Sequence, residues 1–146
     1  MNNPHWFYTY LLPLLPTVLT IAGWFLVARR ESGKQMADRK SKRIDAALLL
    51  VAKIEADALR YYRLPEEVEA KDLAVSIVFD LKRLAGYCRL IHVDLNELLM
   101  NFRISVSGGD FQSGNRQPLP DNARLLMEIK NNAFELQQKL DYFHDH

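Results

Sequence analysis

The sequence contains no lysine, arginine, aspartate or glutamate before Arg29. From Trp6 to Ala28 there are 23 uncharged and mostly apolar residues. At a rise of about 1.5 Å per residue they form a helix of roughly 34 Å, enough to cross a hydrocarbon layer of about 30 Å with a modest tilt. The missing charges also argue against a cleaved signal peptide, because such a peptide starts with a positively charged segment. The sequence therefore predicts a transmembrane anchor over residues 1–28.

Acidic residues are scarce in the segment that follows the predicted anchor. Residues 29–43 contain seven lysines and arginines and only two acidic residues. Positive charges beside a span stay on the cytoplasmic side, so we expect the N-terminus outside and the remaining chain in the cytoplasm. Residues 44–146 carry twelve basic and sixteen acidic residues, a charge of −4. This balance argues against general binding to long nucleic acids.

Cysteine and recognisable catalytic groups are also rare. Cys88 is the only cysteine, so no intramolecular disulfide can form, which suits a reducing compartment. No pair of carboxylates, nucleophile with a base or cluster of metal ligands stands out, and we therefore expect a non-enzyme without a cofactor or metal. His144 and His146 are interpreted as a solvated tail.

Apolar residues spaced three and four apart predict an all-α domain over residues 44–146. Pro65 separates the first two helices, Asp94 and Glu97 suggest a capping box before a short third helix, and the last helix starts after Pro120. About 100 residues in four helices indicate an antiparallel bundle with a thin core, which association would support. The stripes of the two longest predicted helices and the last one are Ile44, Ala47, Val51, Ile54, Ala58 and Tyr61; Ile77, Leu81, Leu84, Cys88 and Ile91; and Leu126, Ile129, Ala133, Leu136, Leu140 and Phe143.

Four further apolar residues exceed what a single buried face needs. We interpret them as candidates for a subunit interface, while the stripes themselves are read as core. These four residues are Leu50, Leu59, Val78 and Phe79.

The segment 107–120 is the one long irregular stretch that the sequence predicts inside the bundle. Gly108 and Gly109 permit positive φ and would let backbone N–H groups converge on an anion. Phe111 offers a ring for stacking on a base. The sharpest hypothesis is a phosphate-bearing ligand such as a nucleotide; the alternative is a plain connecting loop. Further donors to such a ligand would be Arg103, Ser107, Ser113 and Arg116.

Small and helix-breaking residues follow one side of the predicted anchor. Prolines leave carbonyl groups without helical partners, and threonine and glycine let membrane helices approach closely. We therefore expect this side to contact another helix or water. The alternative is that such residues are merely frequent in membrane helices and that Pro16 marks the start of the helix proper. The side consists of Thr9, Pro13, Pro16, Thr20 and Gly23.

A single N-terminal span, a basic junction and a small helical domain without catalytic residues together resemble the membrane effectors associated with CRISPR antiviral defence. The closest design is that of the type III effectors, which bind cyclic tetra-adenylate. The resemblance implies a homo-oligomer, a tetramer or larger, in the bacterial inner membrane. It also implies that a cyclic oligonucleotide signal leads to membrane damage during infection. The alternative function is a membrane-tethered accessory or scaffold subunit that binds a protein partner through its helical domain.

Overall fold

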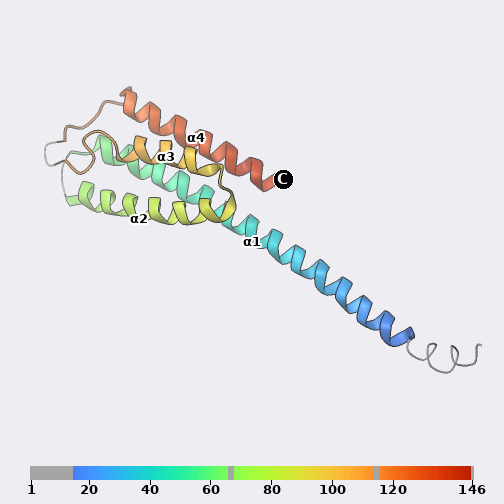
Figure 1. Ribbon diagram of the computed structural model, residues 1–146. Helices are drawn as coiled ribbons and strands as arrows, with labels where there is room; N and C mark the ends of the chain where they lie inside the picture. The colour runs from blue at the N-terminus through green and yellow to red at the C-terminus, as the bar shows by residue number, and fades with distance from the viewer. Residues whose placement is uncertain (1–14, 66–67, 114–115, 146) are drawn as a thin grey trace, which may run out of the picture. The chain divides into compact units, whose positions relative to one another are not determined.

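The computed structural model describes residues 15–65, 68–113 and 116–145 (Figure 1). These residues form helices and irregular connections, and no strand occurs among them. The predicted all-α class is therefore confirmed. The four helices are α1 (Leu15–Arg63), α2 (Val68–Ile91), α3 (Leu95–Ser107) and α4 (Arg124–Asp145).

The chain divides into two units, residues 1–39 and residues 40–146. The boundary falls inside the basic segment 29–43 that the sequence separates from its neighbours. Searched over the described residues, none of the helices carries an apolar stretch long enough to cross a membrane. Residues 6–14 of the predicted anchor, Thr9 and Pro13 among them, lie outside the described part of the chain.

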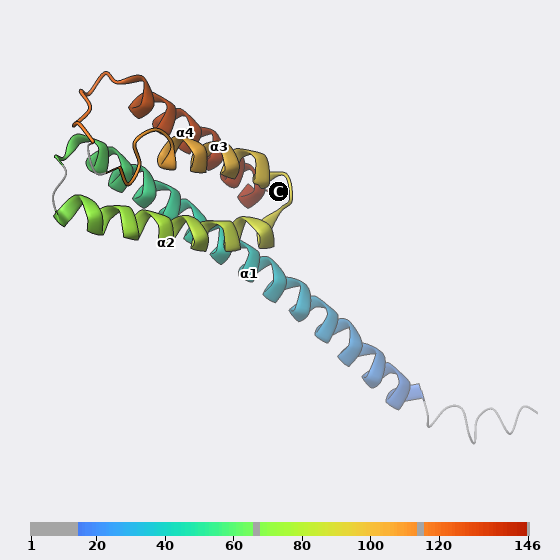
Figure 2. The same ribbon diagram turned by 60° about the vertical axis from the view of Figure 1, so that its left-hand side comes forward.

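The second unit is a bundle formed by the C-terminal part of α1 and by α2, α3 and α4. Both views show successive helices running in opposite directions (Figures 1 and 2). The predicted stripes form the core, with only Ile91 and Phe143 half-buried. The interpretation of Leu50 as a surface residue is wrong, because it is 8% exposed; Phe79, by contrast, is 62% exposed.

Cys88 lies in the core, as expected for a small apolar residue. Its side chain is fully buried, and burial raises the pKa of the thiol to about 11. Such a thiol stays protonated at neutral pH and is a poor nucleophile.

Two ion pairs join α1 to α2. Lys53 Nζ lies 2.5 Å from Asp80 Oδ2, although the Asp80 side chain is only 4% exposed. The hydrogen bond to Asp80 is the main cause that raises the pKa of Lys53. Near the other end of the hairpin, Arg60 pairs with Glu69. These contacts fix the level of α2 along α1.

The start of α3 differs from the predicted capping box. Asp94 has helical dihedral angles, and its side chain makes no cap hydrogen bond. The Asp94 carboxylate instead lies 3.4 Å from Nδ1 of His92, and that ring nitrogen also accepts the Asp94 backbone N–H. Asp94 therefore does not cap the helix through its side chain, in contrast to the predicted capping box.

Gly108 ends α3 at a position with no room for a side chain. A Cβ atom there would lie 2.6 Å from the carbonyl oxygen of Ile104. We predict that Gly108→Ala lowers the free energy of unfolding by about 1–3 kcal/mol, because the backbone must shift. Gly86→Ala is the control: Gly86 lies within α2 with nothing within 4 Å of a Cβ, so alanine should stabilise by about 0.5–1 kcal/mol. Urea unfolding curves would measure both, and equal effects would contradict this account of Gly108.

Candidate anion-binding site

Two tyrosines at the end of α1 attach the loop after α3 to the bundle. The Tyr62 hydroxyl lies 3.0 Å from the Val106 carbonyl oxygen and 2.9 Å from that of Gly108, so it satisfies acceptors at the C-terminus of α3. Burial raises the pKa of Tyr62, which keeps this hydroxyl a donor. The Tyr61 hydroxyl accepts the backbone N–H of Gln112 at 2.9 Å. The loop is therefore positioned by α1.

The glycine pair does not form the expected arrangement. Gly108 is extended, with φ −82° and ψ 179°, so it does not adopt the positive φ that glycine permits; its role is steric. Gly109 has φ +59°, as expected, and Gln112 also has a positive φ of 63°. The Phe111 and Ser113 N–H groups donate to loop carbonyls. Three successive N–H groups of the loop, those of residues 111–113, are thus used inside the protein rather than directed at a shared anion.

Phe111 also has an internal contact. Its half-buried ring lies 5.1 Å from that of Tyr61, centroid to centroid, and packs against the core. This packing stabilises the loop and occupies a ring that the sequence suggested for stacking on a base.

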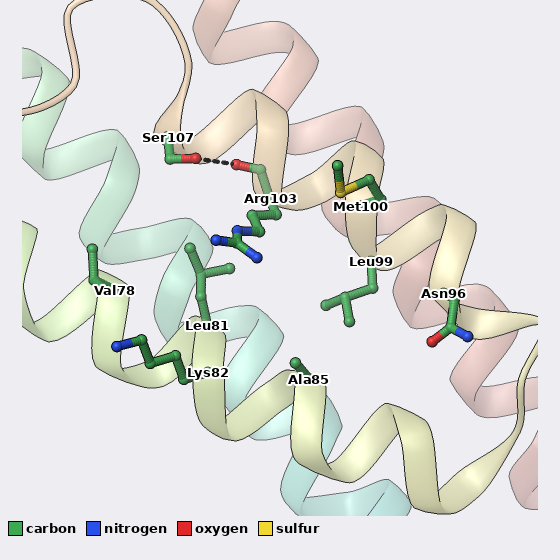
Figure 3. A pocket seen from close by; sticks show the side chains of 9 residues that line it. All are labelled: Val78, Leu81, Lys82, Ala85, Asn96, Leu99, Met100, Arg103 and Ser107. Atoms are coloured by element: carbon green, nitrogen blue, oxygen red, sulfur yellow. Dashed lines mark hydrogen bonds between the residues drawn. The ribbon is translucent and has the colours of Figure 1, made fainter.

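The predicted loop residues are distributed between two separate pockets. Arg103 and Ser107 lie on α3 and line the α2–α3 groove, a hollow of about 280 Å³ (Figure 3). There the Ser107 hydroxyl donates to the Arg103 carbonyl oxygen at 2.8 Å. The groove is lined by Val78, Leu81, Lys82, Ala85, Asn96, Leu99, Met100, Arg103 and Ser107.

Ser113 and Arg116 line a different hollow, which we call the Arg116 pocket. It encloses about 260 Å³ between the end of α1, the start of α2 and the loop. The structure therefore does not bring the two predicted arginines together. The Arg116 pocket is lined by Tyr61, Ala70, Lys71, Ala74, Val75, Gln112, Ser113 and Arg116.

Arg116 is the most unusual side chain of the bundle. It is 5% exposed, and its guanidinium carbon lies 4.1 Å from the centre of the Tyr61 ring. Both terminal nitrogens, Nη1 and Nη2, are buried and find no hydrogen-bond partner among the residues that the structure describes. A buried cation without a hydrogen-bonded partner costs several kcal/mol, and stacking on one tyrosine recovers only about 0.5–2 kcal/mol. The protein therefore holds a guanidinium whose two terminal nitrogens make no hydrogen bond within the described part of the chain.

The chemistry of this pocket suits an anion. A guanidinium presents parallel N–H donors that match a carboxylate or a phosphate, and Lys71 adds a second positive charge at the wall. Tyr61, Lys71 and Gln112 were missed as site residues by sequence reasoning. The spacing of Tyr61 in the sequence indicated only a core residue. Nothing in the sequence placed Lys71 of α2 beside Gln112, which follows it by more than forty residues.

Pro16, Thr20 and Gly23 are the residues of the predicted helix-contacting side of the anchor that the structure describes. The Thr20 hydroxyl donates to the Pro16 carbonyl oxygen at 2.7 Å, one turn earlier in α1. A Cβ on Gly23 would meet nothing within 4 Å.

Comparisons of the chain with protein-family models, with curated proteins and with solved structures find no match.

Proposed function

We propose that this protein is an oligomeric, membrane-anchored effector whose helical bundle binds a phosphate-bearing signal at Arg116 and transmits binding to the membrane. The signal that we propose is a cyclic oligonucleotide, in keeping with the resemblance to effectors of antiviral defence. The single observation that carries the proposal is the buried Arg116 guanidinium, whose two terminal nitrogens find no hydrogen-bond partner among the described residues.

Support for the membrane anchor comes from the sequence of residues 6–28 and from the surface of α1. Within residues 18–27, seven large apolar side chains are each more than half exposed. They occur on every side of the helix, and a helix that is apolar all round needs lipid or protein around it. The seven residues are Val18, Leu19, Ile21, Trp24, Phe25, Leu26 and Val27.

The size of the Arg116 pocket supports one ligand contact per subunit. Pockets that enclose a whole small molecule usually measure about 300–1,000 Å³. At about 260 Å³, this pocket suits a single phosphate with part of its nucleotide. A ring-shaped ligand with several phosphates would therefore be held by several subunits, each supplying one Arg116. This arrangement links binding to oligomerisation.

Calorimetry on the full-length chain in a mild detergent tests the ligand. Cyclic di-, tri-, tetra- and hexa-adenylate would be titrated in turn, and we expect cyclic tetra-adenylate to bind. Losing one charge-assisted hydrogen bond costs about 1.5–3 kcal/mol, so Arg116→Ala should weaken binding by roughly ten- to a hundredfold. Arg103→Ala is the matched control, because Arg103 lines the other pocket, and it should bind normally.

Two outcomes would reject the ligand. Absence of heat with the whole panel would favour the scaffold function, in which the bundle binds a protein partner. Equal losses in the Arg103 and Arg116 variants would show that the binding site is not the Arg116 pocket.

The anchor predicts the behaviour of the chain in membrane fractions. The wild type should stay in the membrane pellet after alkaline carbonate extraction. A basic residue in the middle of a span costs about 2.5–3.5 kcal/mol, so changing both Ile21 and Phe25 to arginine should release the chain from the pellet. Leu49→Arg is the control, since Leu49 is 74% exposed on the bundle part of α1. Extraction of the wild-type chain by carbonate would contradict the anchor.

A further inference from the structure

The α2–α3 groove is separate from the Arg116 pocket, and the proposed function does not use it. Its lining residues come from positions 78–85 of α2 and 96–107 of α3, and each set follows the i, i+3, i+4, i+7 spacing of one helix face. The two faces enclose a hollow of about 280 Å³ (Figure 3). No residue lines both this groove and the Arg116 pocket. The groove is therefore a second, independent hollow of the bundle.

The middle of the groove is apolar. Leu81 and Ala85 of α2 face Leu99 of α3 across it (Figure 3). Met100, which is 54% exposed, adds a further apolar side chain from α3. None of these four side chains is a hydrogen-bond donor or a strong acceptor. Displacing water from this part of the groove by an apolar group is therefore favourable.

One end of the groove carries two positive side chains. Lys82 of α2 and Arg103 of α3 line this end from opposite helices, and the Arg103 guanidinium is directed toward α2 (Figure 3). Neither side chain forms an ion pair or a hydrogen bond with any residue that the structure describes. By contrast, the guanidinium of Arg83, the next residue along α2, lies 3.7 Å from the Asp80 carboxylate. Both groove cations are thus available to an anion from outside the bundle.

The opposite end of the groove is neutral. Asn96 lies there, two helical turns before Arg103 on α3, which corresponds to roughly 10 Å along the helix axis. Beyond Arg103, the Ser107 hydroxyl donates its single proton to the Arg103 carbonyl oxygen. The positive charge of the groove therefore comes from Lys82 and Arg103 alone, and an apolar path leads away from it.

We propose that the α2–α3 groove binds a fatty acid of medium chain length. Its carboxylate lies between Lys82 and Arg103, and its alkyl chain follows the apolar middle of the groove toward Asn96. A carboxylate is ionised at neutral pH and matches the paired donors of a guanidinium. The alkyl chain needs no hydrogen-bond partner, as the apolar middle requires. This site is additional to the proposed signal site in the Arg116 pocket and does not depend on it.

Two other kinds of occupant fit the groove less well. A nucleotide base gains most of its binding from stacking on an aromatic ring, and none of the residues that line the groove is aromatic. One turn of a partner helix, about 5.4 Å long and about 10 Å across, takes roughly 400 Å³. That volume exceeds the whole hollow of about 280 Å³. A single alkyl chain is narrow enough to enter.

Photo-crosslinking of the full-length chain tests the site. The chain is held in an amphipathic polymer, because detergent monomers would compete for the groove. The probe is decanoic acid with a diazirine at the end of its chain, and trypsin then releases peptides 84–89 and 90–103. These peptides contain Ala85, Asn96 and Leu99 of the groove but no residue that lines the Arg116 pocket. We expect saturable labelling of both peptides, displaced by unlabelled decanoic acid.

The charge of the ligand and the two cations are tested together. The matching decanol probe, which has no charge, should label the two peptides about fivefold less at a sub-saturating concentration. Lys82→Gln combined with Arg103→Gln should lower labelling of peptide 84–89 by decanoic acid about fivefold, because exposed ion pairs contribute modestly. Arg124→Gln combined with Lys130→Gln is the matched control, since it removes the same charge from exposed positions of α4. This control should be labelled like the wild type.

Filling the groove tests the path of the alkyl chain. Ala85→Phe places a ring in the apolar middle and should abolish saturable labelling of peptide 90–103. Gly86→Phe is the control, because Gly86 is the next residue of α2, is exposed and does not line the groove. Melting curves followed by circular dichroism check that both variants are folded.

Three results would overturn the proposal. They are labelling that does not saturate, equal labelling by the decanoic acid and decanol probes, and saturable labelling confined to peptide 104–116, which contains Gln112, Ser113 and Arg116 of the other pocket. Calorimetry of the same samples with cyclic tetra-adenylate reports on the Arg116 pocket alone. Failure of the fatty-acid site is therefore distinguished from failure of the proposed function.

Discussion

Replacing Arg116 with methionine is expected to weaken anion binding by roughly ten- to a hundredfold and, at the same time, to stabilise the free protein. Methionine keeps the long stem over the Tyr61 ring but removes a buried charge whose Nη1 and Nη2 atoms have no hydrogen-bond partner in the part of the chain that the structure describes. Replacing buried charges by apolar groups often stabilises by about 1–4 kcal/mol, and the lost cation–π contact offsets part of this gain. We therefore expect a net gain of about 1 kcal/mol in the free energy of unfolding, measured by chemical denaturation without ligand.

The ligand should reverse the order of stability. A ligand that binds only the folded wild type adds stability as its concentration rises above Kd. The wild-type melting temperature should thus rise with added cyclic tetra-adenylate, whereas Arg116→Met should need roughly ten to a hundred times more ligand for the same rise. Arg103→Met is the control. The Arg103 side chain is exposed, so its replacement should change the free energy of unfolding little, and the melting temperature of this variant should respond to ligand like that of the wild type. A strongly destabilised Arg116→Met would show that the guanidinium is a structural group instead of a ligand-binding one.

Replacing Lys53 with methionine should destabilise the bundle by about 2 kcal/mol. The variant leaves the buried Asp80 carboxylate with only the Arg83 guanidinium nearby, at 3.7 Å. Removing one member of a buried pair costs about 3–5 kcal/mol, and the half-exposed position of Lys53 reduces this figure through solvent screening. The free energy of unfolding in urea measures the loss.

A second substitution in the same background identifies the cause. Adding Asp80→Leu to Lys53→Met removes the orphaned carboxylate and should recover most of the lost stability. Lys82→Met is the control for a lysine on the exposed side of α2 and should change stability by less than about 0.5 kcal/mol. If the double variant is no more stable than Lys53→Met, then the buried carboxylate is not the source of the loss.

Much of the helical architecture could be predicted from the sequence. The apolar spacing along residues 44–61 and 126–140 identifies core positions that are buried in the structure. Pro65 correctly marks the break between α1 and α2. These features depend on side chains that share one face of one helix, so the periodicity of the chain contains the information.

Contacts between distant segments could not be predicted in this way. Leu50 was assigned to the surface because the apolar spacing within α1 does not show how much of this helix is covered by the other helices of the bundle. That cover depends on the packing of other helices, which the pattern of a single helix does not contain.

The candidate site shows the same division most clearly. The composition of the loop pointed to an anion and included Arg103, Ser113 and Arg116 as donors. Packing then separated these residues, because α3 directs Arg103 toward α2 while Tyr61 holds Arg116 beside Ser113. The sequence by itself determined the helices, their buried faces and the uncharged N-terminal stretch, because these depend on neighbours within a few turns. Only the tertiary structure decided which loop side chains share a pocket and which cation has two buried nitrogens without a hydrogen-bond partner among the described residues, because those properties depend on helices distant in sequence.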